Sequence, residues 1–242
     1  MESSNPVLKS SVFEKLREDA SRMTINGTIT RALILLVLVV SSALFTWGKV
    51  MAGDVAGAVP WMIGGAIGGL VFCLITCFVQ RAAPVTAPIY AVCEGLLLGA
   101  LSAFMQARYK GIVLEAVLLT VGTLFGLLLA YRTGLVRATE KFKLGVFAAT
   151  IGIGVVYLIG MVMNLFGKGI PYIHESGTIG ICFSLFVVVV AALNLVLDFD
   201  FIEQGEAVGA PKYMEWYAAF GLMVTLIWLY IEFLRLLSKL RR

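Results

Sequence analysis

The chain has 242 residues, of which 60% are hydrophobic and only 14% are charged, and its mean hydropathy is +0.95. This composition excludes a soluble globular protein and indicates an integral membrane protein. The formal net charge is +4, but the bases are scattered at the edges of apolar segments without interleaved exposed aromatic residues, so nucleic-acid binding has no support.

Residues 1–28 form a polar tail ahead of the first apolar segment. The tail has no apolar stretch next to a small-residue cleavage site, so we expect no cleaved signal peptide. Ser11 and Glu14 have the spacing of a capping box, and apolar residues recur every three or four positions from Phe13 to Met23. This pattern predicts a short amphipathic helix on the membrane surface, with a frayed tail as the alternative.

Seven apolar segments follow, each close to the length of about 20 residues that crosses about 30 Å of hydrocarbon. They are 29–50, 59–79, 86–107, 112–131, 144–166, 178–197 and 214–237. Short polar or Gly- and Pro-containing loops separate them, and no loop could hold a soluble domain. The sequence therefore predicts an all-α integral membrane protein with one seven-helix domain over residues 29–242.

The distribution of Lys and Arg predicts the orientation of these helices in the membrane. With the N-terminus in the cytosol, eleven of these bases lie on the cytosolic side and four lie in the outer loops. Four further bases, Arg235, Lys239, Arg241 and Arg242, then lie outside, unless the last helix enters the membrane without crossing it. We expect a cytosolic N-terminus.

Glycines recur four residues apart in three of the segments. The pairs are Gly64/Gly68, Gly65/Gly69, Gly95/Gly99 and Gly122/Gly126. Pairs of small residues at this spacing allow membrane helices to approach closely. We interpret them as packing contacts, with a role in gating as the alternative.

Enzyme signatures are missing from the sequence. A serine intramembrane protease needs a buried His, but the single histidine, His174, lies in a loop, and the Gly-x-Gly-Asp setting of a di-aspartyl protease is absent. No phosphate-binding glycine loop occurs, and the four cysteines have no nearby His with which to form a zinc site. We expect neither an enzymatic activity nor a bound cofactor.

Glu94 is the acidic residue that lies deepest in a predicted span. It is about eight residues into the third segment, some 12 Å from its start at 1.5 Å per residue. Ionisable residues at such depth are costly and mark ion or proton pathways by default. We expect Glu94 to point into the bundle, the alternative being a protonated, hydrogen-bonded carboxyl with a structural role.

A second group of acids follows the sixth span. Asp198 and Asp200 would point to nearly opposite sides of a continuing helix, so we expect Asp198 to face the interior. Asp200 and Glu203, with Glu215 further on, are predicted to form a cytosolic mouth whose negative field concentrates cations. A solvated acidic loop is the alternative. Arg81, at the inner end of the second span, is predicted to pair with this group as a breakable latch.

The last span carries a polar face at helical spacing. It consists of Thr225, Trp228, Glu232 and Arg235, and the last two are placed to form a pair. The rest of the segment is apolar on all sides, which indicates a buried central helix, and an ordinary membrane-edge anchor is the alternative.

Four short segments carry a combined pattern: 23–28 (MTINGT), 88–95 (PIYAVCEG), 197–204 (LDFDFIEQ) and 232–237 (EFLRLL). This pattern resembles the Bax inhibitor family of transmembrane proteins, in particular its bacterial branch, and the resemblance covers most of the chain. It implies six helices around the C-terminal one, and a pH-sensitive calcium leak across a bacterial inner membrane. In such proteins an aspartate ending the sixth helix and another in the seventh sense protons.

Asp198, or Asp200 on a shifted alignment, matches the first of these aspartates, whereas the second falls at about Thr225, which has no carboxylate. We expect Glu94 to replace it, with Glu215 as second choice. Asp198 and Glu94 would then form a joint pH sensor and offer Ca²⁺ two hard oxygen ligands. The prediction is a pH-sensitive cation leak channel. The alternatives are a regulator that binds a membrane protease or stress machinery, and a proton-coupled secondary transporter.

Overall fold

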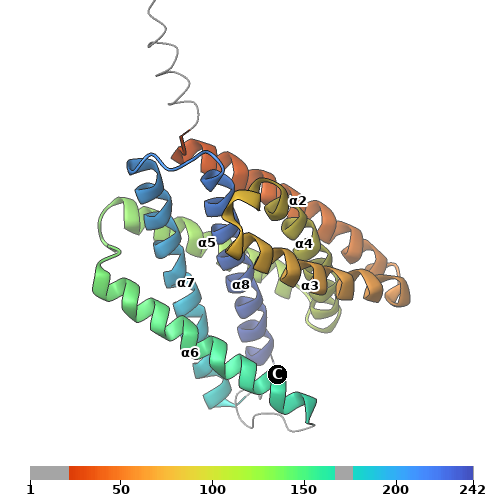
Figure 1. Ribbon diagram of the computed structural model, residues 1–242. Helices are drawn as coiled ribbons and strands as arrows, with labels where there is room; N and C mark the ends of the chain where they lie inside the picture. The colour runs from red at the N-terminus through yellow and green to blue at the C-terminus, as the bar shows by residue number, and fades with distance from the viewer. Residues whose placement is uncertain (1–21, 167–176, 242) are drawn as a thin grey trace, which may run out of the picture.

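Seven long helices make up the computed structural model, which describes residues 22–166 and 177–241 (Figure 1). Their bounds are α2 Ile25–Met51, α3 Val55–Phe78, α4 Ala83–Arg108, α5 Ile112–Arg132, α6 Glu140–Leu165, α7 Thr178–Ala207 and α8 Met214–Leu240, with a short 3-10 helix, η1, at Gln80–Ala82. All seven are long and apolar enough to cross a membrane. The predicted architecture is confirmed, and the predicted amphipathic helix of the tail lies outside the described residues.

Several helices begin or end a few residues away from the predicted spans, and two of these differences affect the site. α2 begins at Ile25 rather than at residue 29, because the Thr24 hydroxyl accepts a hydrogen bond from the Gly27 N–H at 3.0 Å and caps the helix. α7 continues to Ala207 rather than ending at Leu197. Asp198, Asp200 and Glu203 therefore lie on a helix and have fixed directions relative to its neighbours.

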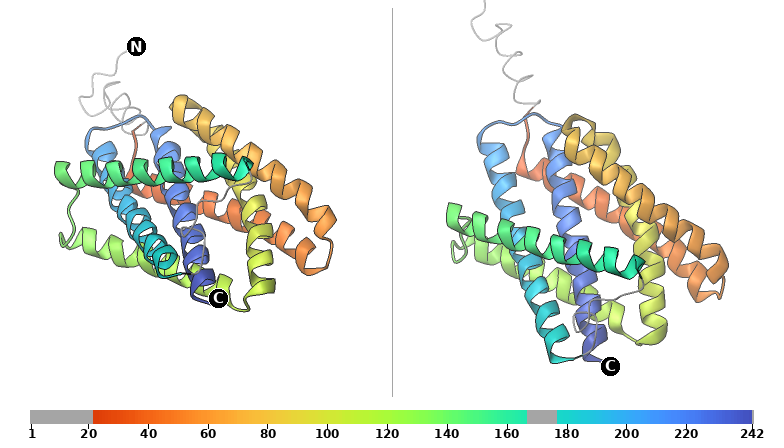
Figure 2. Two further views of the ribbon diagram at one scale, coloured as in Figure 1. Left: turned by 90° about the horizontal axis from the view of Figure 1, so that it is seen from below. Right: turned by 60° about the horizontal axis from the view of Figure 1, so that its bottom comes forward.

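α8 is the central helix, and it runs through the middle of the molecule in every view (Figures 1 and 2). It packs against α2, α4, α5 and α7. Phe220 and Met223 join an apolar cluster with α2 and α4, while Leu229 and Phe233 join a second cluster with α5 and α7. The predicted central position of the C-terminal helix is confirmed, but α3 packs against α4 and α2, and α6 packs mainly against α7.

Glycines of α4 bring its backbone into contact with that of α2. A Cβ atom at Gly95 would lie 2.3 Å from the Val39 carbonyl oxygen, and one at Gly99 would lie 2.0 Å from the carbonyl oxygen one turn further along α2. Gly65 of α3 is similarly close to α4, since its Cβ would lie 2.5 Å from the Cys93 carbonyl oxygen. The predicted packing role of these glycines is confirmed.

The glycine pair of α5 behaves differently. Cβ atoms at Gly122 and Gly126 would have no described atom within 4 Å. Both glycines face open space, and α5 contacts α7 and α8 through its other sides. The predicted close packing at this pair is wrong, because the same spacing here lies on a face that none of the described helices covers.

Candidate functional site

The starts of α2 and α8 lie beside the ends of α5 and α7, and we call this end of the molecule the N-terminal end of the bundle. It holds most of the acidic residues selected from the sequence, namely Asp198, Asp200, Glu203 and Glu215. The structure fixes a different environment for each of them.

Asp198 lies on α7 where this helix packs against α8. Its Oδ1 is 3.9 Å from the position of a Cβ atom at Gly221, and the Thr225 hydroxyl one turn further along α8 lies near the carboxyl. Its Oδ2 is buried and has no hydrogen-bond partner among the described residues. Asp198 thus faces α8 near Thr225. Thr225 is the position at which the family resemblance implies a second aspartate.

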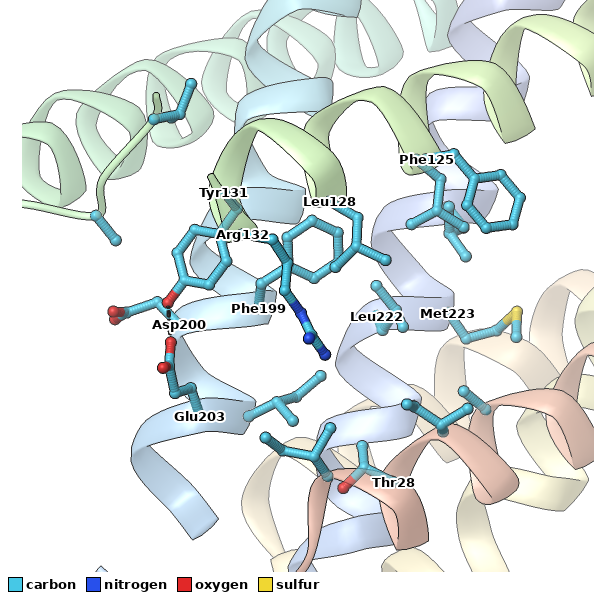
Figure 3. Close-up of a pocket in the computed structure, with 18 of the residues that line it drawn as sticks. Thr28, Phe125, Leu128, Tyr131, Arg132, Phe199, Asp200, Glu203, Leu222 and Met223 are labelled. Carbon is cyan, nitrogen blue, oxygen red and sulfur yellow. Dashed lines mark hydrogen bonds between the residues drawn. The ribbon is translucent and has the colours of Figure 1, made fainter. Parts of the chain in front are cut away.

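Asp200 and Glu203 point away from this interface. The Nζ atom of Lys143, near the start of α6, lies 2.9 Å from Asp200 Oδ2, and Gln204 donates a hydrogen bond to the same oxygen. Glu203 accepts a hydrogen bond from the Tyr131 hydroxyl of α5, shown as the dashed line in Figure 3. These two acids therefore connect α7 to α6 and α5.

Glu215 does not belong to an exposed mouth, and this part of the prediction is wrong. The residue is 0% exposed, and its Oε1 accepts hydrogen bonds from the Thr24 N–H at 3.1 Å and from the Thr24 hydroxyl at 3.0 Å. Arg31 Nη2 lies 3.3 Å from Oε2, and Lys212 Nζ lies 3.6 Å from Oε1. A Cβ atom at Gly27 would lie 2.0 Å from Oε1, so the carboxylate needs a glycine there.

The residues before α2 explain this burial, because they fold back onto the loop between α7 and α8. The Met23 N–H donates to the Ala210 carbonyl at 2.7 Å, and the Met23 side chain is 2% exposed. The Ile25 N–H donates to Glu206 Oε1 at 2.9 Å. Two carboxylates, those of Glu206 and Glu215, thus accept the first N–H groups at the start of α2, where negative charge is favourable.

Glu94 lies apart from Asp198. Its Oε1 is 2.8 Å from the position of a Cβ atom at Gly69, so the half-buried side chain faces α3. Neither carboxyl is among the groups that interact with the other. The structure therefore does not form the predicted Asp198–Glu94 pair, and the described residues contain no cluster of three or more His, Cys, Asp or Glu side chains that could hold a metal ion.

Arg81 does not form the predicted latch. It is exposed in η1 and makes no ion pair with any described residue. The base that faces the acidic residues of α7 is Lys143, which the loop between α5 and α6 places beside Asp200. The sequence prediction placed Arg81 at the correct end of the bundle, but η1 packs against α3, α4 and α8, whereas Lys143 lies beside α7.

The polar face of α8 continues with a second buried carboxylate. Glu232 is 1% exposed, and its Oε1 accepts hydrogen bonds from Arg235 at 2.8 Å and from the Tyr157 hydroxyl of α6 at 2.9 Å. The Arg235 guanidinium also stacks over the Tyr157 ring, 5.0 Å from its centroid. The predicted pairing of Glu232 with Arg235 is confirmed, and Tyr157 is its partner on another helix.

The bases at the end of α8 have partners at the opposite end of the bundle. Lys239 donates to the Ser184 hydroxyl and to the Gly180 carbonyl near the start of α7. Arg241 pairs with Glu115 at the start of α5, with 2.6 Å between Nη2 and Oε1. α8 therefore runs from one end of the bundle to the other, and the alternative of a last helix that does not cross has no support.

A cavity of about 880 Å³ opens at the N-terminal end of the bundle, between α2, α5, α7 and α8 (Figure 3). Its lining is mainly apolar and includes Leu33, Phe125, Phe199 and Met223. The polar side chains at its edge are those of Thr28, Tyr131, Arg132, Arg137, Thr139, Asp200 and Glu203.

These features define a polytopic helical membrane protein with carboxylates buried at helix interfaces around a central C-terminal helix. Residues 5–242 match the family model described as Bax inhibitor 1 like, so the chain belongs to this family. No curated protein and no solved structure matches the chain.

Proposed function

We propose that the protein is a pH-sensitive cation leak channel, with Ca²⁺ as its principal ion and Asp198 as its proton-sensing group. The observation that supports this most directly is the buried Oδ2 of Asp198, which has no hydrogen-bond partner in the described part of the chain. We also propose that the N-terminal end of the bundle faces the cytosol across a bacterial inner membrane, as the distribution of Lys and Arg predicts.

Asp198 differs from the fully buried carboxylates in having no cation beside it. Glu215 has Arg31, and Glu232 has Arg235, whereas the side chain that interacts with Asp198 is the Thr225 hydroxyl. An ionised carboxylate without a cation or water is costly in a protein interior. Tight packing of α7 on α8 therefore suits a neutral Asp198, and loss of its proton as pH rises favours a rearrangement that admits water.

Oxygen atoms around Asp198 suit a divalent cation once this interface opens. The Thr225 hydroxyl donates to the Gly221 carbonyl at 3.3 Å, and both groups lie on the turn of α8 that faces Asp198. Carboxylate, hydroxyl and carbonyl oxygens are hard ligands of the kind that Ca²⁺ prefers. Asp200 and Glu203 lie at the same end, but Asp200 pairs with Lys143, and Arg132 and Arg137 line the same cavity, so the described part of this end has no net negative field. Glu94 remains a separate candidate on the α3 side.

Ion flux through the purified protein in liposomes tests this proposal, with Ca²⁺, Na⁺ and H⁺ measured while the pH is varied on each side. The leak of the wild type should increase with pH on the side that Asp198 faces, and Asp198→Asn should make it independent of pH. Glu115→Gln, a change at the opposite end of the bundle, is the matched control and should keep the wild-type profile. A normal pH profile in a folded Asp198→Asn protein would remove Asp198 as the sensor.

The same measurement separates the other two functions. A secondary transporter would couple Ca²⁺ movement to a counterflow of protons at a fixed ratio, whereas a leak would conduct Ca²⁺ without it. A regulatory protein that binds a membrane protease or stress machinery would show no flux above that of protein-free liposomes.

A further inference from the structure

The cavity at the N-terminal end of the bundle has the form of a groove open to the side. Its floor consists of buried side chains of α7 and α8, including Phe199, Ile202 and Met223. Its walls are side chains of α2 and α5 that remain exposed, such as Leu33 at 57% and Phe125 at 63%. In a membrane these exposed walls face lipid, so the groove is accessible from the hydrocarbon layer.

Arg132 gives this groove a charged end. It lies in the last turn of α5 on the same face as Phe125 and Leu128, seven and four residues earlier, and its side chain extends into the groove (Figure 3). The Arg132 side chain forms no hydrogen bond or ion pair with the described residues. Arg137, in the loop that follows, also lines the groove, and its Nε atom donates only to the nearby Gly134 carbonyl.

The carboxylates near these arginines already have other partners. Asp200 pairs with Lys143, and Glu203 accepts the Tyr131 hydroxyl, which points away from Arg132 in Figure 3. The groove thus presents two guanidinium groups without carboxylate partners at the end of an apolar channel. An anion with an apolar tail complements this distribution.

We propose that the groove binds an anionic phospholipid of the surrounding membrane. The phosphate lies against Arg132 and Arg137, because a guanidinium binds phosphate oxygens through two parallel hydrogen bonds. An acyl chain lies between α2 and α5, over Phe199 and Met223. Basic pockets between transmembrane helices near the membrane surface are suited to anionic headgroups. The volume of about 880 Å³ lies within the usual range of ligand sites, about 300–1,000 Å³.

The test compares binding of phosphatidylglycerol and phosphatidylcholine with identical acyl chains to the purified full-length protein in detergent, by native mass spectrometry and by thermal stabilisation. Phosphatidylglycerol should bind the wild type more tightly than phosphatidylcholine. Arg132→Gln should weaken phosphatidylglycerol binding about tenfold or more, since it removes charge-assisted hydrogen bonds. Arg137→Gln should have a smaller effect in the same direction.

Arg81→Gln is the matched control, because Arg81 is exposed at the same end of the bundle but does not line the groove. It should leave phosphatidylglycerol binding unchanged. Equal binding of the two lipids, or equal weakening by Arg132→Gln and Arg81→Gln, would overturn the proposal. Displacement of phosphatidylglycerol by inorganic phosphate alone would also overturn it, since the acyl chain would then contribute nothing. If Arg132→Gln does not fold, Arg137→Gln carries the same comparison with Arg81→Gln.

Discussion

The two sides of the bundle are held together by different kinds of contact. On one side, α2, α3 and α4 meet through glycines that bring backbones together, as at Gly95 and Gly65. On the other side, glycines of α5 and α6, such as Gly126 and Gly152, have no described atom within 4 Å of a Cβ position. There, α6 is joined to its neighbours through side chains, both apolar ones such as Ile153 and Val187 and polar ones such as the hydrogen-bonded Asn194 and Thr150.

This difference indicates which side can respond to protons. Backbone packing between α2 and α4 contains no titratable group, and it is intolerant of displacement because dense packing leaves no free volume. By contrast, Lys143 of α6 pairs with Asp200 of α7, and Tyr157 of α6 donates a hydrogen bond to Glu232 of α8. The strength of both contacts depends on the charge of the carboxylate. We therefore expect a change of pH to move α6 and α7 against α8 while α2 and α4 stay together.

The largest expected effect tests the contact between α2 and α8. Glu215→Gln leaves Arg31 beside a neutral amide, and the loss of one partner from a buried ion pair costs about 3–5 kcal/mol of unfolding free energy. Thermal unfolding in detergent measures the loss. Glu115→Gln is the control, because its pair with Arg241 is exposed and contributes about 0–1 kcal/mol. Equal stability of the two variants would show that the Arg31–Glu215 ion pair contributes little to the contact between α2 and α8.

A smaller effect compares the two kinds of glycine directly. Gly95→Ala places a methyl group against the Val39 carbonyl oxygen and should destabilise the protein by about 1–3 kcal/mol. Gly126→Ala meets open space and should instead stabilise α5 by up to about 1 kcal/mol, through helix propensity. The sign of the shift in unfolding temperature distinguishes them. A shift of the same sign in both variants would remove the contrast between the two sides.

The smallest effect concerns the polar contacts of α6. A double-mutant cycle with Asn194→Leu and Thr150→Val should give a coupling energy of about 0.6 kcal/mol, the average for hydrogen bonds between membrane helices. Each variant should leave the α2–α4 contact unaffected, as judged by cysteine cross-linking between these helices. A coupling energy near zero would mean that apolar contacts alone position α6.

Local patterns made much of this fold predictable. The seven spans follow from long apolar runs, and the Glu232–Arg235 pair follows from a spacing of three residues on one helix. The end of α7 was not predictable in the same way. Asp198 and Asp200 indicate the end of an apolar span, but the helix continues past them, and Asp200 pairs with Lys143 of α6. The spacing of the glycines also does not distinguish Gly95 from Gly126, because whether a glycine lies at a helix contact depends on the position of the neighbouring helix.

The candidate site was less predictable because its contacts join distant parts of the chain. Glu215 and Thr24 are 191 residues apart, and no local pattern shows that the segment before α2 folds onto the start of α8. The segment 23–28 is one of those that resemble the family, and its structural role lies in this contact, since Thr24 and Gly27 accommodate the Glu215 carboxylate.

This long-range contact has a consequence for biogenesis. Arg31 lies in α2, which is synthesised before the other six long helices, but its partner Glu215 lies at the start of α8. Until α8 is inserted, the guanidinium of Arg31 and the N–H of Thr24 lack the Glu215 carboxylate that they contact in the finished bundle. Insertion of α8 is thus the step that completes the start of α2, and a chain cut short before α8 leaves the Arg31 charge without this partner.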